Sequence, residues 1–133
     1  MRYLALACDY DGTLATQGSV REETVAALYR VVESGRKLLL VTGRQLEDLL
    51  AIFPQVTLFA RVVAENGAVL YDPANREEKI LATPPPEEFP RALRARGVWP
   101  LSLGRVIVAT EHPYEIAILD TISESWSRIT GHF

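Results

Sequence analysis

The sequence predicts an α/β protein built on a parallel sheet, and three observations support this prediction. Short apolar runs at residues 4–8, 37–41 and 61–64 have the length and composition of buried strands. Segments with apolar residues at helical spacing separate these runs. The order strand, helix, strand, helix, strand is typical of parallel sheets joined by right-handed crossovers.

The two predicted helices carry clear boundary signals. Apolar residues recur at helical spacing from Val25 to Val32, and Gly35 follows where a helix end favours glycine. The segment 46–53 repeats the amphipathic pattern over a shorter length. We expect it to end before Pro54, because proline lacks the amide hydrogen that a helix interior needs.

The character of the chain changes near Asp72. Prolines and paired acids between residues 72 and 88 are typical of a connector between two substructures. This change predicts a second part of the chain with its own elements. Those elements are a helix at 88–96, a strand at 105–109 and a helix at 113–129.

Composition and charge exclude several classes of protein. Of 133 residues, 48% are hydrophobic and 23% are charged, which matches a globular domain and excludes a disordered or collagen-like chain. The net charge of −3 gives no general attraction to nucleic acid or acidic membranes. No apolar run is long enough to span a membrane, and the amino-terminal run is too short for a signal peptide. We therefore expect a cytoplasmic protein.

Two acids follow the first apolar run, in the order Asp9-Tyr10-Asp11-Gly12-Thr13. Ligands bind beyond the carboxyl ends of strands in open parallel sheets, so both acids stand where chemistry is expected. If the extended backbone continues to Asp11, the two carboxylates lie on the same side of the strand and close together. Their repulsion requires compensation by protonation or by a cation, and Mg²⁺ is a cation that prefers such oxygen ligands. The alternative is a simple Asp-Gly turn, which is a common turn pair.

A second polar motif, Thr42-Gly43-Arg44, follows the second apolar run and precedes a helix. A hydroxyl, an unhindered backbone amide and a helix start together suit an anionic oxygen. A glycine at a strand-to-helix turn is also ordinary, so this motif gains weight from its place at the same sheet edge as Asp9.

These motifs, together with Glu65-Asn66-Gly67-Ala68, resemble the haloacid dehalogenase (HAD) superfamily, and within it the Cof-like branch of sugar-phosphate and other phosphatases. The resemblance covers residues 1–72 well and the remainder loosely. It implies a partial HAD Rossmann-like parallel sheet over residues 1–78, followed by the beginning of an α/β cap over residues 79–133.

The resemblance also implies roles for individual residues. Asp9 is the implied nucleophile, which becomes an aspartyl-phosphate, and Asp11 is the implied general acid and base. Mg²⁺ is the implied cofactor, held by the Asp9 carboxylate and by Asp11 through its backbone carbonyl. The implied substrate is a small phosphorylated metabolite, such as a sugar phosphate. The residues that phosphate or substrate binding would use are Gly12, Thr13, Thr42, Gly43, Arg44 and Asn66.

The sequence departs from the family pattern in its second half. The family's third motif contributes a lysine and its fourth contributes acids, whereas Lys37 and Lys79 stand in neither place. We therefore interpret the chain as the first half of a phosphatase, with weak activity or none. The alternative function is a non-catalytic metal- or phosphate-binding remnant, or an interaction module that needs a partner chain.

The same departure predicts an exposed flank on the first strand. In the family sheet that strand has a neighbour on each side, and one of the two comes from the second half. We expect a homodimer, another partner chain or a substitute strand at 105–109 to cover this edge.

Overall fold

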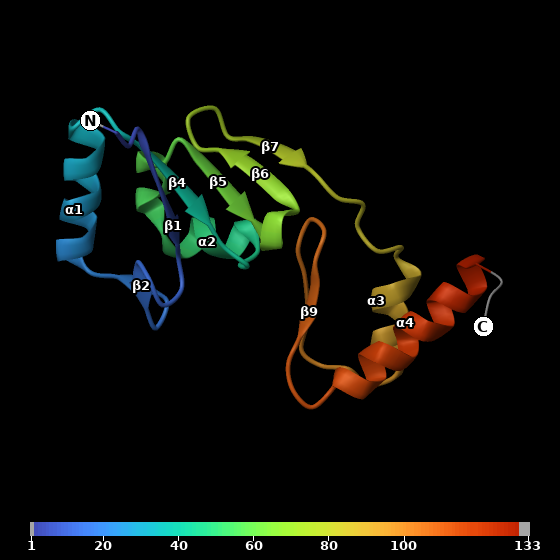
Figure 1. Cartoon of the computed structure of the whole chain (residues 1–133). Helices are drawn as coiled ribbons and strands as arrows, with labels where there is room; N and C mark the ends of the chain where they lie inside the picture. Colours follow the sequence, from blue (N-terminus) through green and yellow to red (C-terminus); the bar gives the residue numbers. More distant parts are fainter. Residues whose placement is uncertain (1, 131–133) are drawn as a thin grey trace. The chain divides into compact units, whose positions relative to one another are not determined.

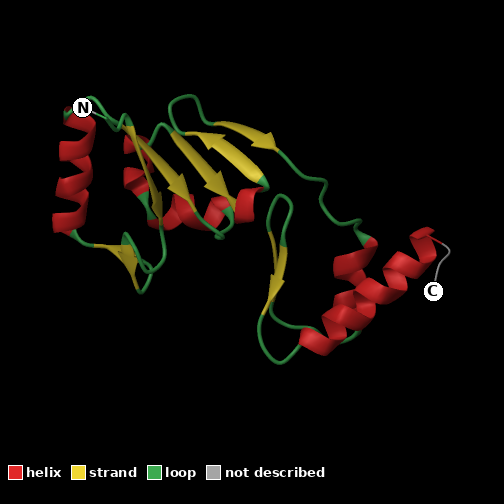
Figure 2. Ribbon diagram, in the orientation of Figure 1, coloured by secondary structure: helices red, strands yellow, loops and turns green. Residues whose placement is uncertain are grey.

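The computed structural model describes residues 2–130, with side chains as far as residue 125. The chain forms two compact units (Figures 1 and 2). The first contains Met1–Thr83 and Gly104–Val106, and the second contains Pro84–Leu103 and Ile107–Phe133. The chain therefore leaves the first unit once, returns to it briefly, and leaves it again.

A five-stranded sheet of order β1-β4-β5-β6-β7 forms the centre of the first unit. Strands β1, β4 and β5 are parallel, whereas β6 and β7 continue the sheet in antiparallel pairs. The predicted α/β class and the strands at 37–41 and 61–64 are thus confirmed. The bounds of the strands are β1 Ala5–Asp9, β4 Lys37–Val41, β5 Arg61–Ala64, β6 Val69–Asp72 and β7 Glu77–Ile80.

Both predicted helices of the first unit are present. They are α1 (Glu22–Glu33) and α2 (Leu46–Ile52), and α2 ends just before the 3-10 helix η1 (Pro54–Leu58), as its proline predicts. A second 3-10 turn, η2 (Glu65–Gly67), links β5 to β6. A small hairpin of β2 (Ala15–Thr16) and β3 (Ser19–Val20) stands between β1 and α1.

The core of the first unit lies on one face of the sheet. Alternate residues of β4 and β5, such as Leu38, Leu40 and Val62, are fully buried there, as period-two alternation requires. Phe53, at the end of α2, sits among them, with its ring centroid 5.3 Å from that of Tyr10 and 5.8 Å from that of Phe59. The residues of this core cluster are Tyr10, Ala15, Leu28, Leu38, Leu40, Leu46, Leu49, Phe53, Val56, Phe59, Val62, Ala64, Val69 and Tyr71.

A Phe53→Ala substitution is expected to lower the free energy of unfolding by about 3–5 kcal/mol. The reason is that the Phe53 side chain is only 1% exposed and touches two other rings, so its removal leaves a cavity. Denaturant unfolding followed by circular dichroism measures the change. Ile52→Ala is the control, because Ile52 is the preceding residue and is 39% exposed. Equal losses in the two variants would contradict the position of Phe53 in the core.

The first strand departs from its prediction. It was expected to be buried on both faces, yet Leu4 is 76% exposed and Leu6 is 44% exposed, and only Cys8 is buried. The physical reason is that β1 is an edge strand, bonded to β4 alone among the described strands. The open flank predicted for this strand is therefore present. The sheet face opposite the core is also partly open, since Val41 is 45% exposed.

Two further predictions for the second half of the chain hold only in part. The strand expected at 105–109 is present at residues 108–110, but it does not pair with β1. Instead, β8 (Leu101–Leu103) and β9 (Val108–Thr110) pair with each other as a hairpin. The connector expected at 72–88 does contain the division between the two compact units, after Thr83, but its first part forms the strand β7, which pairs with β6. Its residues are all exposed, so no buried apolar side marked it in the sequence.

The second unit contains the two helices that the sequence predicted. Helix α3 (Glu88–Ala95) packs against α4 (Glu115–Thr130), and Arg96 forms an ion pair with Glu124 between them. Leu93 and Val98 are buried in this unit. Over the part of the chain that the structure describes, no helix has both the length and the apolar character needed to cross a membrane.

Candidate active site

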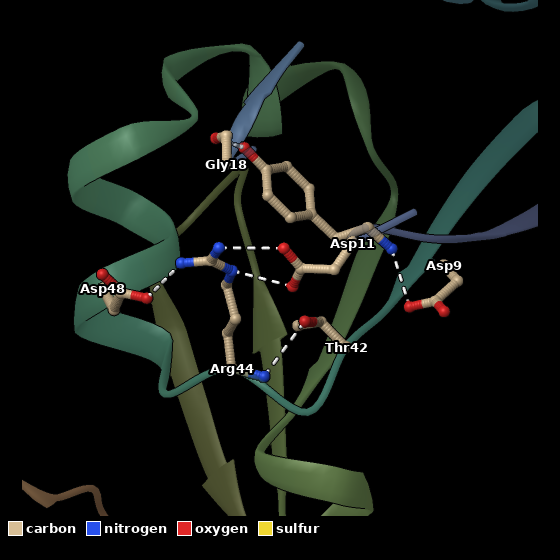
Figure 3. Close-up of polar contacts among 7 residues, drawn as sticks. Asp9, Asp11, Gly18, Thr42, Arg44 and Asp48 are labelled. Carbon is tan, nitrogen blue, oxygen red and sulfur yellow. Dashed lines mark hydrogen bonds and ion pairs between the residues drawn. The ribbon is translucent and has the colours of Figure 1, made fainter. Parts of the chain in front are cut away.

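The polar motifs meet at the carboxyl edge of the parallel strands. The register pairs Asp9 with Val41 and Val41 with Val63, so the segments that follow β1, β4 and β5 leave the sheet side by side. These segments carry the acids, the Thr42-Gly43-Arg44 motif and Asn66, in that order. The sheet therefore brings together the acids and the Thr42-Gly43-Arg44 motif, as the sequence analysis expected (Figure 3). Asn66, which only the family resemblance implied, lies beside this motif.

Tyr10 fixes the turn that carries both acids. Its side chain is fully buried, and its hydroxyl donates to the Gly18 carbonyl at 2.8 Å. Its carbonyl accepts the amides of Leu14 and Ala15 at 3.0 and 2.9 Å. Gly12 has a φ of 77° in this turn, a conformation that costs glycine little. Sequence reasoning did not assign Tyr10 a role, although an aromatic residue between two acids was a visible signal.

Asp9 and Asp11 have different hydrogen-bond partners. The Asp9 Oδ1 atom accepts the Tyr10 amide at 2.8 Å, while the Asp11 carboxylate turns to the guanidinium of Arg44 (Figure 3). The expectation that both carboxylates share one side and lie close together does not hold in this conformation. The reason is that β1 ends at Asp9 and the chain turns at Tyr10, so strand alternation does not reach Asp11.

Arg44 holds the Asp11 carboxylate with two hydrogen bonds. The Nε and Nη2 atoms donate to Oδ2 and Oδ1, each at 2.8 Å. The third nitrogen, Nη1, donates to Asp48 at 2.7 Å, and the guanidinium carbon lies 5.5 Å from the centre of the Tyr10 ring. Such planar, bidentate pairing is the strong form of the arginine–carboxylate contact. Sequence reasoning missed Asp48, although a carboxylate four residues after an arginine on a helix start was a usable signal.

This pairing shifts the titration of both groups. The hydrogen bonds from Arg44 lower the pKa of Asp11 below its usual range, and the hydrogen bonds to Asp11 raise the pKa of Arg44. Because the pKa of Asp11 is lower in the folded chain than in the unfolded one, its contribution to stability is present at neutral pH. That contribution is lost as the pH falls through the folded-state value.

An Arg44→Met substitution is expected to raise the pKa of Asp11 towards that of an unpaired aspartate. Methionine keeps much of the length of the side chain and removes the charge and all three donors. A pH titration of the Asp11 carboxyl carbon by NMR measures the change. Arg61→Met is the control, since Arg61 pairs with Asp72 at 3.2 Å. An unchanged Asp11 pKa in Arg44→Met would show that the contact is not maintained in solution.

The Thr42-Gly43-Arg44 motif forms a tight turn against Asn66. Thr42 is buried, and its Oγ1 atom accepts the Arg44 amide at 3.0 Å. The Asn66 amide donates to the Thr42 carbonyl at 3.3 Å. A Cβ atom on Gly43 would lie 2.7 Å from the Asn66 Oδ1 atom, so a larger residue at this position would displace the Asn66 side chain. Asn66 thus lies directly against the motif.

The remaining predicted residues, Gly12 and Thr13, lie in the turn after β1. The Gly12 amide donates to the Ala15 carbonyl at 3.0 Å and the Thr13 amide donates to the Tyr10 carbonyl at 3.3 Å. Their backbone groups therefore shape the acidic turn.

Fold and site together define a class of protein. Its members are α/β proteins in which an acid at the end of the first strand shares a sheet edge with a tight Thr-Gly-Arg turn after the second strand. The chain belongs to the family of haloacid dehalogenase-like hydrolases, whose pattern matches residues 6–89. The resemblance inferred from the motifs is thereby confirmed.

Known relatives are similar to part of this chain. Phosphatase YwpJ of Bacillus subtilis (strain 168) is 35% identical over 72 residues, which are 53% of this chain and 25% of that protein. A haloacid dehalogenase-like hydrolase from Bacteroides thetaiotaomicron has a TM-score of 0.65 at 19% identity, over 92% of this chain and 48% of that chain. A HAD subclass IIB sugar phosphatase has a TM-score of 0.56 at 21% identity, over 90% and 48%.

The two solved structures show the fold, since their identities are low. The chain spans a quarter of the length of the curated phosphatase and about half of each of the two solved structures. That this chain has the activity of a whole phosphatase is therefore a proposal.

Proposed function

We propose that this chain is a Mg²⁺-dependent phosphohydrolase, or the part of one that accepts the phosphoryl group, and that it acts on a small phosphorylated metabolite. The observation that carries the proposal is the position of Asp9, at the end of β1 and next to the Thr42-Gly43-Arg44 turn. The similarity to a curated phosphatase and the shared fold with a sugar phosphatase support this reaction class. Within this reaction class, we propose a sugar phosphate as the substrate.

Asp9 is the proposed nucleophile. One of its carboxylate oxygens attacks phosphorus, the bond to the leaving oxygen breaks, and an aspartyl-phosphate forms. The Tyr10 amide, which donates to Asp9 Oδ1, orients that carboxylate. The Thr42 hydroxyl and the Gly43 amide are the proposed donors to the phosphoryl oxygens, where negative charge must be neutralised.

Asp11 is the proposed proton carrier. It protonates the leaving oxygen in the first step, and its carboxylate then takes a proton from the water that hydrolyses the aspartyl-phosphate. Because Arg44 lowers the pKa of Asp11, the carboxylate form dominates while the two side chains are paired. Proton donation therefore requires Asp11 to leave Arg44 when the substrate is in place.

The donor set at the end of β1 fits Mg²⁺. The Asp9 carboxylate and the Asp11 backbone carbonyl are hard oxygen donors, and magnesium is commonly held by one or two such groups together with substrate phosphate. No set of three His, Cys, Asp or Glu side chains gathers as a metal site among the described residues, so this donor set is small. When bound, Mg²⁺ supplies positive charge that lowers the repulsion between the nucleophile and the phosphate.

A non-catalytic phosphate-binding module is the second candidate function. The pairing of Arg44 with both Asp11 and Asp48 favours it, because Asp11 is then held by Arg44 and is not free to transfer a proton. Hydrolysis of an aryl phosphate in the presence of Mg²⁺, with Asp9→Asn as the reference, separates the two functions.

We also propose that a second copy of the chain covers the edge of β1. An edge strand offers unpaired amide and carbonyl groups, and charged side chains normally protect it from other chains. Residues 3–8 carry no charge, and Leu4 and Leu6 are exposed.

Light scattering after size-exclusion chromatography is expected to give the mass of a dimer. The double substitution Leu4→Lys with Leu6→Lys is expected to give a monomer, because it places like charges on the edge. Leu119→Lys is the control, since Leu119 is 62% exposed on α4. A monomeric wild-type chain would rule out self-association through this strand.

A further inference from the structure

Glu65 is a buried carboxylate that the proposed chemistry does not use. It is 1% exposed, and it accepts two backbone amides from a distant part of the chain. The Arg105 amide donates to Oε2 at 3.0 Å and the Val106 amide donates to Oε1 at 2.9 Å. A buried charge is costly unless such hydrogen bonds compensate it.

The segment Gly104–Val106 is shaped around this carboxylate. A Cβ atom on Gly104 would lie 2.4 Å from Glu65 Oε1, and the other two carboxyl atoms are less than 3 Å from the same point. Successive backbone amides that point at one anion form a concave binding turn. Here the anion is a side chain of the protein, and the turn belongs to the same compact unit.

The backbone of Glu65 is tied to the proposed phosphate-binding motif. The Glu65 amide donates to the Arg44 carbonyl at 3.0 Å, and the next amide, that of Asn66, donates to the Thr42 carbonyl. Glu65 and Asn66 have φ values of 52° and 56°. Such left-handed conformations are uncommon outside glycine and persist when surrounding contacts hold them.

We propose that Glu65 is a positioning residue that clasps the Gly104–Val106 turn to the Thr42–Arg44 segment. The Glu65 side chain binds the Gly104–Val106 turn, and the Glu65 backbone binds the Thr42–Arg44 segment. Together these contacts maintain the left-handed conformations of Glu65 and Asn66, which place Asn66 against Gly43. The geometry of the Thr42–Arg44 segment thus depends on a turn 60 residues further along the chain. The clasp itself is independent of the proposed function, which enters only through the claim that this segment binds phosphate.

Amide hydrogen exchange tests the clasp directly. Glu65→Gln keeps the size of the side chain but places an amide group against one of the two donors. Exchange at the Arg105 and Val106 amides is therefore expected to speed up by about 10-fold or more. Gly104→Ala disturbs the same contact from the other side and should also speed up this exchange. It replaces Glu65→Gln as the test if that variant fails to fold.

Glu78→Gln is the matched control. Glu78 pairs with the Arg105 side chain at 2.8 Å, while Glu47 pairs with the same side chain at 3.1 Å. Loss of the Glu78 pair leaves the backbone amides of the turn hydrogen-bonded to Glu65. Exchange in Glu78→Gln is expected to match the wild-type chain, and equal rates in Glu65→Gln and the wild-type chain would overturn the clasp.

Titration with inorganic phosphate tests the coupling to the motif. The apparent Kd, followed at the Gly43 and Arg44 amides by NMR, is expected to rise several-fold in Glu65→Gln and to stay unchanged in Glu78→Gln. An unchanged Kd in Glu65→Gln would overturn the coupling. A wild-type chain that binds no phosphate would count against the proposed function instead, and the exchange rates at Arg105, Val106 and Asn66 would then decide the clasp alone.

Discussion

An Asp11→Asn variant is expected to hydrolyse a phosphate monoester about 10²- to 10⁴-fold more slowly than the wild-type chain, the range that a positioned general acid and base contributes. Asparagine has nearly the same shape and can still accept a hydrogen bond from Arg44, but it neither gives nor takes a proton near neutral pH. The loss is therefore expected in the rate of turnover rather than in the fold. Steady-state assays across the pH range, with the folded state checked by circular dichroism, measure it.

Asp48→Asn is the control for this prediction. Asp48 shares Arg44 with Asp11, at 2.7 Å, but it is placed on α2 and has no proposed role in proton transfer. Its substitution is expected to change the rate far less than Asp11→Asn. Losses of the same size in both variants would mean that Arg44 and its charge, not the Asp11 proton, determine the rate.

The fold could be predicted where burial leaves a pattern in the sequence. The strands β4 and β5 are central, so their apolar runs are continuous, and α1 and α2 carry amphipathic stripes that end at glycine and before proline. Strand β1 has the same apolar run, yet it is an exposed edge. A run of apolar residues indicates a strand suited to burial, and it does not say whether a neighbour is present. Strand β7 shows the converse, since its exposed residues left no apolar signal.

The site could be predicted as a set of residues but not as a set of contacts. Parallel strands end at one edge, so the acids and the Thr42 motif were placed together correctly. Asn66 was implied by the family resemblance alone. The pairing of Arg44 with Asp11 depends on where the chain turns after Asp9, and residue spacing does not determine that turn. The contact of Glu65 with residues 105 and 106 joins positions about 40 residues apart in the sequence. No local sequence pattern predicts a contact over such a separation.

The largest effect is expected at Asp9. An Asp9→Asn substitution removes the carboxylate that is proposed to bond to phosphorus, and no neighbouring group is proposed to replace it. Asparagine keeps the oxygen that accepts the Tyr10 amide, so the turn that carries Asp11 is expected to remain in place. The variant should therefore fold like the wild-type chain and lose covalent chemistry alone.

The most direct test is the steady-state hydrolysis of a generic aryl phosphate in the presence of Mg²⁺, measured for the wild-type chain and for Asp9→Asn under the same conditions. The wild-type chain is predicted to release phosphate faster than the variant, and the variant is predicted to match the uncatalysed rate. Equal rates for the two proteins would contradict catalysis by this chain and leave the phosphate-binding function in its place.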